Sequence, residues 1–370
     1  MRFPEFTEEW KAEQLDNIAT LSKGIGISKE QLSEDGEPCI LYGELYTKYK
    51  SEIIKQVESK TDINGSKLKR SKANDVIIPC SGETAVDIAT ARCVPFDNIL
   101  FGGDLNVISL HQYDGAFMSY QLNGKRKYDI ARVAQGVSIV HLYGEHLKAI
   151  KTYNPTLPEQ QKIAKLLSLL DDRIDTQNKI IEDLKKLKSA ISERLFNAIK
   201  GDVVVLEDIG DVVKGKQING EFLSESGKYY VMNGGIEPSG FYNDYNVEAN
   251  TISISEGGNS CGYVQFNACP FWSGGHCYTI QNTTDNVKTE YLYQFLKSKE
   301  SEIMKLRIGS GLPNIQKKDL AKFKITIPNI SEQKVISAFL SSFERKADVE
   351  MNFVNLLLEE KQYLLRQMFI

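Results

Sequence analysis

The sequence predicts an α+β fold in which two mixed α/β units are separated by two long helices that form an antiparallel coiled coil, giving an internal pseudo-two-fold repeat. Three observations lead to this prediction. Two long stretches match at a constant offset, both carry apolar residues at heptad spacing, and strand-like segments with glycine-containing loops precede each of them. The 370 residues therefore read as globular unit, helix, globular unit, helix.

The duplicated helices give the clearest signal. The stretch Glu159 to Phe196 aligns without a gap with Glu332 to Phe369, each residue 173 positions later. Neither stretch contains glycine or proline, and apolar residues recur at alternating steps of three and four, as in a two-stranded coiled coil. The predicted apolar seam consists of Ile163, Leu167, Leu170, Ile174, Ile181, Leu184, Ile191 and Leu195 in the first helix, and of Ile336, Leu340, Phe343, Val354, Leu357, Leu364 and Met368 in the second.

Two lysines within the seam indicate how the helices are oriented. In a parallel pair in register, Lys188 would face Lys361, and like charges would meet inside the seam. Antiparallel packing instead places Lys188 opposite Phe343 and Lys361 opposite Leu170. We expect the lysine stems to pack there while the ammonium groups reach solvent. An antiparallel pair relates the two globular units by a pseudo-two-fold axis.

The repeat extends into the globular units. The segment Asn74–Gly82 resembles Asn250–Gly258, since each is a β-branched run that ends in a glycine-containing loop. The first unit is expected to be two residues longer from Gly136 to Leu147 than the second from Gly311 to Leu320. Strands are expected over residues 74–80, 99–110, 250–255 and 261–266, and helices over residues 114–132 and 289–305.

Composition indicates a cytoplasmic globular protein. Hydrophobic residues make up 41% and charged residues 25% of the chain, and no apolar run approaches the roughly 18 residues of a membrane span. The N-terminus carries acidic residues where a signal peptide needs an apolar core. A net charge of −4 argues against a general nucleic-acid binder, yet local lysine clusters still allow phosphates to dock.

Catalytic motifs were sought, and none is convincing. The tetrapeptide from Asn154 to Leu157 lacks the second proline and the aromatic residue of an adenine methyltransferase, and no phosphate-binding loop of the Gly-x4-Gly-Lys-Ser/Thr type occurs. Cys261, Cys269 and Cys277 stand too far apart for a usual structural zinc site. We therefore expect no catalytic residue, no metal and no cofactor in this chain.

Four segments and two helices together carry a family resemblance: RFPEFTEEW, DVIIPCSG, the first helix that begins with Glu-Gln, TISISEGGNSCG, RIGSGLPNIQKKDLAKFKITIP and the second helix that begins with Glu-Gln. In this order, and over essentially the whole chain, they resemble the specificity subunit of type I restriction-modification systems. The resemblance implies a non-catalytic subunit in which each globular unit reads one half of a bipartite, asymmetric DNA target. It implies target-recognition domain 1 at 1–157, conserved spacer helix 1 at 158–200, target-recognition domain 2 at 201–330 and conserved spacer helix 2 at 331–370.

The resemblance also implies partners. These are double-stranded DNA, two methyltransferase (modification) subunits and restriction/translocase subunits, and S-adenosylmethionine, ATP and Mg²⁺ would belong to the partner subunits. Two alternatives remain open at this point. One is a coiled-coil scaffolding protein without DNA readout, and the other is a fused methyltransferase, which the missing motifs disfavour.

Most candidate DNA contacts are basic or small polar residues on loops or beside glycines, where they can reach phosphates or base edges, and one is the aromatic Tyr242, which could contact bases or sugars. The alternative for each is a solvated surface residue or an ordinary turn. In the first unit the candidates are Lys67, Lys69, Arg70, Ser81, Thr84, Lys125, Arg126 and Lys127. In the second unit they are Lys214, Lys216, Tyr242, Asn259, Ser260, Arg307, Ser310, Asn314 and Lys317.

Overall fold

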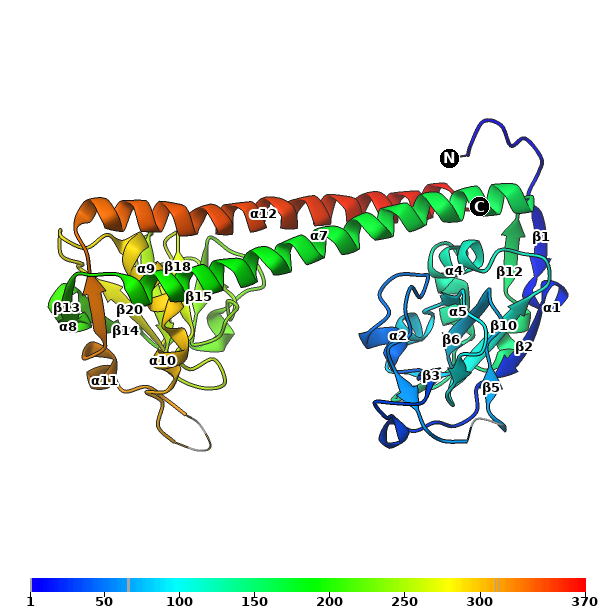
Figure 1. Cartoon of the computed structure of the whole chain (residues 1–370), viewed down its shortest axis with the longest axis horizontal. Coiled ribbons are helices and arrows are strands. Elements are labelled where there is room, and N and C mark those ends of the chain that lie inside the picture. Colours follow the sequence, from blue (N-terminus) through cyan, green and yellow to red (C-terminus); the bar gives the residue numbers. More distant parts are fainter. Residues whose placement is uncertain (1, 65–66, 310, 312) are drawn as a thin grey trace. The chain divides into compact units, whose positions relative to one another are not determined.

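The structure, a computed structural model, describes residues 2–64, 67–309, 311 and 313–370. It consists of two compact units: unit 1 comprises Met1–Asn178 and Asn352–Ile370, and unit 2 comprises Lys179–Met351. Two long helices, α7 (Leu157–Ala198) and α12 (Ile330–Gln367), each contribute one half to either unit (Figure 1). None of the helices formed by the described residues is long and apolar enough to cross a membrane.

Unit 1 is built on a four-stranded antiparallel sheet in the order β2-β10-β6-β8. Helix α4 lies between this sheet and the long helices (Figure 1). The strands are β1 (Lys11–Gln14), β2 (Ala19–Lys23), β3 (Glu37–Ile40), β4 (Lys60–Thr61), β5 (Lys69–Arg70), β6 (Asp75–Pro79), β7 (Ser81–Gly82), β8 (Arg92–Val94), β9 (Leu100–Phe101), β10 (Leu105–Leu110), β11 (Val140–His141) and β12 (Lys151–Asn154). The shorter helices are α1 (Leu15–Ile18), α2 (Glu44–Thr47), α3 (Ala85–Ile88), α4 (Gly115–Asn123), α5 (Lys127–Val133) and α6 (Gly144–Lys148).

Unit 2 repeats this plan. Its four-stranded sheet has the order β14-β20-β17-β18, and helix α9 packs on β17 and β18. The strands are β13 (Asp202–Val205), β14 (Asp211–Lys214), β15 (Tyr229–Met232), β16 (Phe241–Tyr242), β17 (Thr251–Ser255), β18 (Val264–Asn267), β19 (Trp272–Ser273), β20 (Cys277–Gln281) and β21 (Lys324–Ile327). The shorter helices are α8 (Leu206–Ile209), α9 (Thr289–Ser298), α10 (Glu300–Met304) and α11 (Lys317–Ala321).

The predicted strands over residues 74–80 and 250–255 are confirmed as β6 and β17, and the strand predicted over residues 261–266 begins only at Val264. The other three predicted elements are each divided in two: residues 99–110 form β9 and β10, residues 114–132 form α4 and α5, and residues 289–305 form α9 and α10. Equivalent strands occupy equivalent places in the two central sheets, and each unit also contains one parallel strand pair, β3 with β9 and β15 with β19. The residues that begin the matched segments also share a conformation. Asn74 and Asn250 have φ angles of 82° and 59°, a left-handed conformation that asparagine tolerates better than most residues.

The packing on both faces of strand β6 explains why its sequence is apolar without alternation. Val76 and Ile78 face a core cluster built with α1 and α4, whereas Ile77 faces a second cluster that contains Val107. Both faces of the strand are therefore covered, so every side chain is buried. Burying each of these aliphatic side chains contributes about 1.5–3 kcal/mol.

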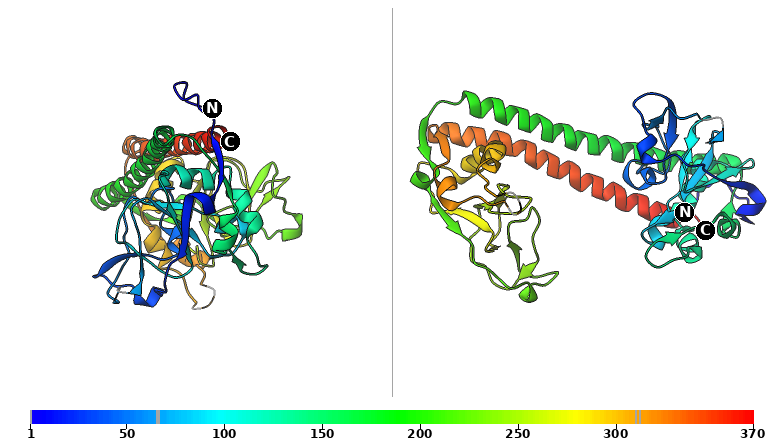
Figure 2. Two further views of the ribbon diagram at one scale, coloured as in Figure 1. Left: turned by 90° about the vertical axis from the view of Figure 1, so that its right-hand side faces the viewer. Right: turned by 90° about the horizontal axis from the view of Figure 1, so that it is seen from below.

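The long helices pack along the predicted seam. Every apolar seam residue is buried or half-buried. In unit 1, the start of α7 lies near the end of α12 (Figure 2). Ile163 and Leu167 of α7 share a core cluster there with Leu365 and Met368 of α12. In unit 2, Leu340 near the start of α12 shares a cluster with residues near the end of α7. The helices thus run in opposite directions in each unit, and the predicted antiparallel pairing is confirmed.

Both seam lysines form ion pairs, and Lys361 does not reach solvent as expected. In unit 1, Lys361 Nζ lies 2.5 Å from Glu52 Oε2 and 2.6 Å from Asp171 Oδ1, and the lysine side chain is 11% exposed. In unit 2, Lys188 Nζ lies 2.7 Å from Glu344 Oε1. The expectation was wrong because it considered only the apolar seam and not the carboxylates next to it. Ion pairs compensate the buried ammonium group of Lys361, whereas the pair at Lys188 is partly exposed.

The lysines belong to a duplicated cluster of three side chains that we call the helix clamp: Tyr120, Asp171 and Lys361 in unit 1, and Tyr293, Glu344 and Lys188 in unit 2. The tyrosine hydroxyl donates to the carboxylate at 2.7 Å in unit 1 and at 3.3 Å in unit 2. Each tyrosine lies on a short helix of the globular part, so the clamp fixes that part on both long helices of its unit.

Candidate nucleic-acid interface

Both units form the same loop structure where the central strands β6 and β17 end. In unit 1, the Leu142 amide donates to the Cys80 carbonyl at 2.8 Å, and in unit 2 the Ile315 amide donates to the Glu256 carbonyl at 2.8 Å. In each unit, a first loop follows the end of the central strand, and a second loop from later in the chain is hydrogen-bonded to the first. We call them the paired loops: residues 80–84 with 134–143 in unit 1, and 256–260 with the described residues 306–309, 311 and 313–316 in unit 2.

Backbone hydrogen bonds within the second loop of each unit correct the predicted alignment. Reciprocal backbone hydrogen bonds join Gln135 with His141 and Ile308 with Asn314. The following glycines, Gly136 and Gly309, have φ angles of 123° and 96°. Gly309, and not Gly311, is therefore the counterpart of Gly136. Glycine adopts this backbone conformation far more readily than other residues, which supports the pairing of Gly136 with Gly309. The segments from these glycines to Leu147 and Leu320 have equal lengths, so the expected two-residue difference was wrong.

The side chains on the paired loops of unit 1 are aromatic and basic. Lys23 Nζ, at the end of β2, lies 5.7 Å from the centre of the Tyr143 ring. His141 stacks on Tyr143 at 6.3 Å, and His146 meets the same ring edge-on at 5.6 Å. Ser81 Oγ lies 3.3 Å from His141 Nδ1. This cluster offers hydrogen-bonding groups and a flat ring at one surface.

The paired loops of unit 2 hold a buried carboxylate instead. Glu256 Oε1 accepts from Lys214 Nζ at 2.6 Å and from the Tyr278 hydroxyl at 3.0 Å. Burial raises the pKa of Tyr278, and the hydrogen bond to Glu256 raises it further. The Ser260 hydroxyl donates to the Gly234 carbonyl at 2.5 Å. Identical backbone plans therefore present different side chains in the two units.

The predicted contacts at β5 lie outside the paired loops. Lys67 is exposed and Lys69 is half-buried. The Arg70 guanidinium donates to both carboxylate oxygens of Glu37, at 2.6 and 3.0 Å, and these bonds raise the pKa of Arg70. Ser81 does lie in the paired loops, as does Thr84, whose hydroxyl oxygen caps α3.

The predicted trio Lys125 to Lys127 lies at the junction of α4 and α5, and Lys127 begins α5. Lys125 is exposed and Lys127 is half-buried. Arg126 pairs with Asp129 at 3.1 Å and donates to the Ile370 carbonyl at 3.1 Å. Its guanidinium thus contacts the last residue of the sequence and not the paired loops, and a DNA contact by this residue stays a prediction.

In unit 2, most predicted contacts come together. Lys214, Asn259, Ser260, Arg307 and Asn314 all lie on or beside the paired loops. Lys317, which is exposed, opens α11 directly after them. Ser310 lies outside the described residues.

Two further predicted residues of unit 2 form a separate contact. Tyr242 meets the ring of Trp272 edge-on at 5.3 Å. The Trp272 indole in turn donates to the Lys216 carbonyl at 2.9 Å. Ring packing and this hydrogen bond thus join the segments around Lys216, Tyr242 and Trp272. Lys216 is exposed, and Tyr242 and Trp272 are half-buried.

Sequence reasoning missed the aromatic residues of unit 1. Lys23, His141 and Tyr143 were not candidates, although His141 stands 173 positions before Asn314, which was. Applying the repeat offset to the candidates of unit 2 would have found it. A groove of about 1100 Å³ adjoins these loops and is lined in part by Tyr42 and Tyr46.

The cysteines and histidines show no metal-binding arrangement. Cys261 and Cys277 are buried, whereas Cys269 is exposed. Burial raises the pKa of the Cys277 thiol to about 11, and the Cys261 thiol donates to the Glu256 carbonyl at 3.0 Å. In the described ranges, no group of three His, Cys, Asp or Glu side chains is placed to hold a metal ion.

Comparisons with known proteins agree on one family. The sequence model of the type I restriction modification DNA specificity domain matches twice, at residues 7–186 and 200–357. A putative type I specificity subunit of Mycoplasma pneumoniae is 34% identical over 161 residues, which are 43% of this chain and 42% of that protein. This chain thus spans less than half the length of that relative. The MjaVIII specificity subunit of Methanocaldococcus jannaschii is 23% identical over 93% of this chain and 88% of its own.

A solved structure shares the fold. The crystal structure of the type I restriction-modification S subunit from M. genitalium superimposes with a TM-score of 0.67 at 20% sequence identity, covering 100% of this chain and 97% of that one. The two copies of the family domain coincide with the two halves of the internal repeat. The chain belongs to the specificity-subunit family of type I restriction-modification systems.

Proposed function

We propose that this chain is the sequence-specific DNA-recognition subunit of a type I restriction-modification complex. It reads a bipartite, asymmetric DNA target and directs the methyltransferase and endonuclease subunits to it. One observation carries the proposal: the same paired-loop backbone occurs once in each unit and presents different side chains. A duplicated backbone with divergent side chains suits the reading of two different half-sites.

The chemistry of the paired loops supports DNA as the ligand. His141, Asn314 and Ser81 bring donors and acceptors suited to base edges in the major groove. Exposed lysines such as Lys317 suit phosphates. Because unit 1 presents histidine and tyrosine where unit 2 presents asparagine and a buried glutamate, the two half-sites should differ.

The outer faces of the long helices support a role in docking partner subunits. Several large apolar side chains there are exposed in the described chain, whereas the solvated face of a helix typically carries charged or polar residues. They are Leu166, Leu169, Leu187, Val335, Phe339, Val349, Leu356, Leu358 and Tyr363. In this proposal two methyltransferase subunits cover these faces, restriction/translocase subunits join them, and the reactions that need S-adenosylmethionine, ATP and Mg²⁺ belong to those subunits.

The proposal is tested with the full chain assembled with its methyltransferase subunits. The complex is incubated with a random-sequence duplex pool, and bound DNA is recovered and sequenced. We expect enrichment of one split motif with two different halves. A complex that assembles but enriches no split motif would instead support a scaffolding protein without DNA readout. The methyltransferase subunits alone serve as the control and should enrich nothing.

A further inference from the structure

In unit 1, residues 2–10 cover the surface where α7 begins and α12 ends (the blue segment beside α7 in Figure 1). Arg2 donates to both carboxylate oxygens of Glu159, at 2.6 and 2.7 Å, and the Trp10 indole donates to the same carboxylate at 3.4 Å. Phe3 packs on the apolar cluster that joins the two long helices. Glu159 is fully buried, with 0% exposure. An arginine and two aromatic rings thus close this end of unit 1.

The equivalent surface of unit 2, where α12 begins and α7 ends, is a groove of about 610 Å³. Four of its lining residues stand at the repeat offset of 173 from residues at the covered surface of unit 1. Glu332, Val335, Ile336 and Leu195 correspond to Glu159, Lys162, Ile163 and Met368, respectively. Val335 is 70% exposed, and Glu332 is exposed as well. We call this place the open groove.

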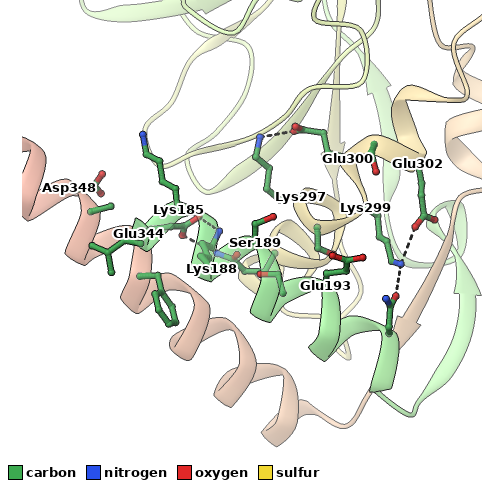
Figure 3. A pocket seen from close by; sticks show the side chains of 18 residues that line it. Lys185, Lys188, Ser189, Glu193, Lys297, Lys299, Glu300, Glu302, Glu344 and Asp348 are labelled. Carbon is green, nitrogen blue, oxygen red and sulfur yellow. Dashed lines mark hydrogen bonds and ion pairs between the residues drawn. The ribbon is translucent and has the colours of Figure 1, made fainter. Parts of the chain in front are cut away.

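The lining of the open groove combines apolar side chains with one carboxylate that lacks a cation. Five of its eight residues are apolar, and the charged ones are Lys200 and Glu332. In the part of the chain that the structure describes, no ion pair engages Glu332. A second groove of unit 2, between α7, α10 and α12, differs in this respect, because three of its lysines pair with its own carboxylates (Figure 3). The open groove therefore fits a ligand that brings one positive charge and an apolar group.

We propose that the open groove binds a short segment of a methyltransferase subunit in which an arginine stands close to an aromatic residue. This rests on the proposed function, in which the long helices dock such subunits. The covered surface of unit 1 decides the chemistry of the segment, because Arg2 and Phe3 already bind Glu159 and the apolar cluster there. In the open groove, a guanidinium can donate twice to the Glu332 carboxylate while an aromatic ring covers Val335.

Two other occupants fit less well. Residues 2–10 of a second copy would leave the Glu159 of that copy without its arginine, so the exchange would gain nothing. They would also bring the carboxylate of Glu5, which pairs with a lysine in unit 1, against the apolar Val335. A DNA phosphate would be repelled by Glu332, and a single lysine lines the groove in the described chain.

The first test measures binding of the methyltransferase subunit to the full chain by native mass spectrometry and sedimentation. The wild type should bind two copies, and only one of them can use the open groove because residues 2–10 cover its counterpart. Glu332→Gln should therefore weaken one of the two binding steps about tenfold and leave the other unchanged. Glu207→Gln, which removes an exposed carboxylate of unit 2 outside the groove, is the matched control and should change neither step. Equal effects of the two variants would overturn the inference.

The second test identifies the bound segment by photocrosslinking. Val335 is replaced by p-benzoylphenylalanine in the assembled complex, and the crosslinked peptide is identified by mass spectrometry. It should belong to the methyltransferase subunit and contain an arginine close to an aromatic residue. The same replacement at Lys162 is the matched control and should crosslink to residues 2–10 of this chain, since Lys162 Nζ lies 4.5 Å from the centre of the Phe3 ring. A crosslink from position 335 to a second copy of this chain, or to a peptide without arginine, would overturn the inference.

The third test asks whether the two charged groups touch. The arginine found by crosslinking is replaced by glutamine, alone and together with Glu332→Gln. Because either change removes the same ion pair, the double variant should bind no more weakly than either single variant, whereas additive losses would contradict a direct contact. If the wild type binds no methyltransferase subunit, the proposed function fails and this inference fails with it. If two copies bind and no arginine of theirs is found at the open groove, the groove inference alone is overturned.

Discussion

Replacing Lys361 by methionine tests whether the helix clamp of unit 1 holds the globular part on the long helices. Methionine keeps much of the apolar stem but removes the ammonium group. The two carboxylates that the lysine neutralises are themselves buried, with side-chain exposures of 8% for Glu52 and 4% for Asp171. Neither carboxylate could gain water without opening the contact between α12 and the globular part of unit 1.

The magnitude follows from this burial. Removing one partner of a buried ion pair costs about 3–5 kcal/mol, because an uncompensated charge remains inside the protein. Lys361→Met should lie in this range. Lys188→Met is the matched control at the equivalent position of unit 2, where Glu344 is 33% exposed. Water can solvate that carboxylate, so the control should cost roughly 1 kcal/mol.

The pH dependence gives a second signature. Burial raises the pKa of Asp171 in the folded protein, although Lys361 opposes this shift. Folding therefore favours the protonated acid. This contribution is fully present below the unfolded pKa of about 4 and is lost as the pH rises through the folded pKa. Without Lys361 the folded pKa rises further, so the deficit of Lys361→Met should shrink as the pH falls from 7 to 5.

Urea unfolding followed by tryptophan fluorescence provides the assay. The chain has two tryptophans, and Trp10 of unit 1 lies 5.7 Å from Phe117 and 6.3 Å from Phe369, ring centre to ring centre. In a Trp272→Phe background, Trp10 alone reports the unfolding of unit 1. Unfolding of unit 2 in the control is followed in a Trp10→Phe background. The reasoning is refuted if Lys361→Met costs no more than Lys188→Met, or if its deficit grows on acidification.

Four further outcomes are expected. Tyr120→Phe should lower the free energy of unfolding by about 1.5–3 kcal/mol, since it removes a hydrogen bond to a buried carboxylate, and more than Tyr293→Phe does; equal urea midpoints would contradict this. In the assembled complex, Lys317→Ala should weaken binding equally for all sequences and reduce the slope of log K against log salt by about 0.9, whereas a changed motif would contradict a phosphate contact. Gly309→Val should impair selection of one half-site only, because valine is strained at φ 96°, and loss of both halves in sequenced bound DNA would argue against independent units. Inserting one heptad in both long helices should lengthen the gap between half-sites by about three base pairs, since seven helical residues rise about 10.5 Å, and an unchanged gap would exclude the helices as spacers.

Much of the fold could be predicted because its signals are local or repeated. The heptad spacing identified the buried face of both long helices, and the like charges of Lys188 and Lys361 excluded a parallel pair in register. Strands such as β6 follow from a short β-branched run before a loop. The repeat then related strands and helices predicted in one unit to their counterparts in the other. A pattern within one segment alone does not give such a second line of support.

The candidate site was predicted only in part. Residues beside the glycines of unit 2, such as Asn314 and Lys214, do lie together at the paired loops. Arg126 carries the same charge as these lysines but is engaged at the end of α12. Basic character alone does not distinguish a DNA contact from an internal ion pair, because the partner comes from a distant part of the chain.

The sequence by itself determined the duplication, the long helices with their buried seam, and the antiparallel pairing of these helices. The heptad spacing is visible within each helix, and the repeat alignment pairs Lys188 with Lys361, so their repulsion in a parallel arrangement can be recognised from the sequence. Only the tertiary structure decided what surrounds the charges in that seam. Glu52 meets Lys361 across 309 positions, and Gly309 rather than Gly311 aligns the paired loops. Those contacts depend on how far the chain folds back and on which backbone angle a residue adopts, and neither leaves a periodic trace in the sequence.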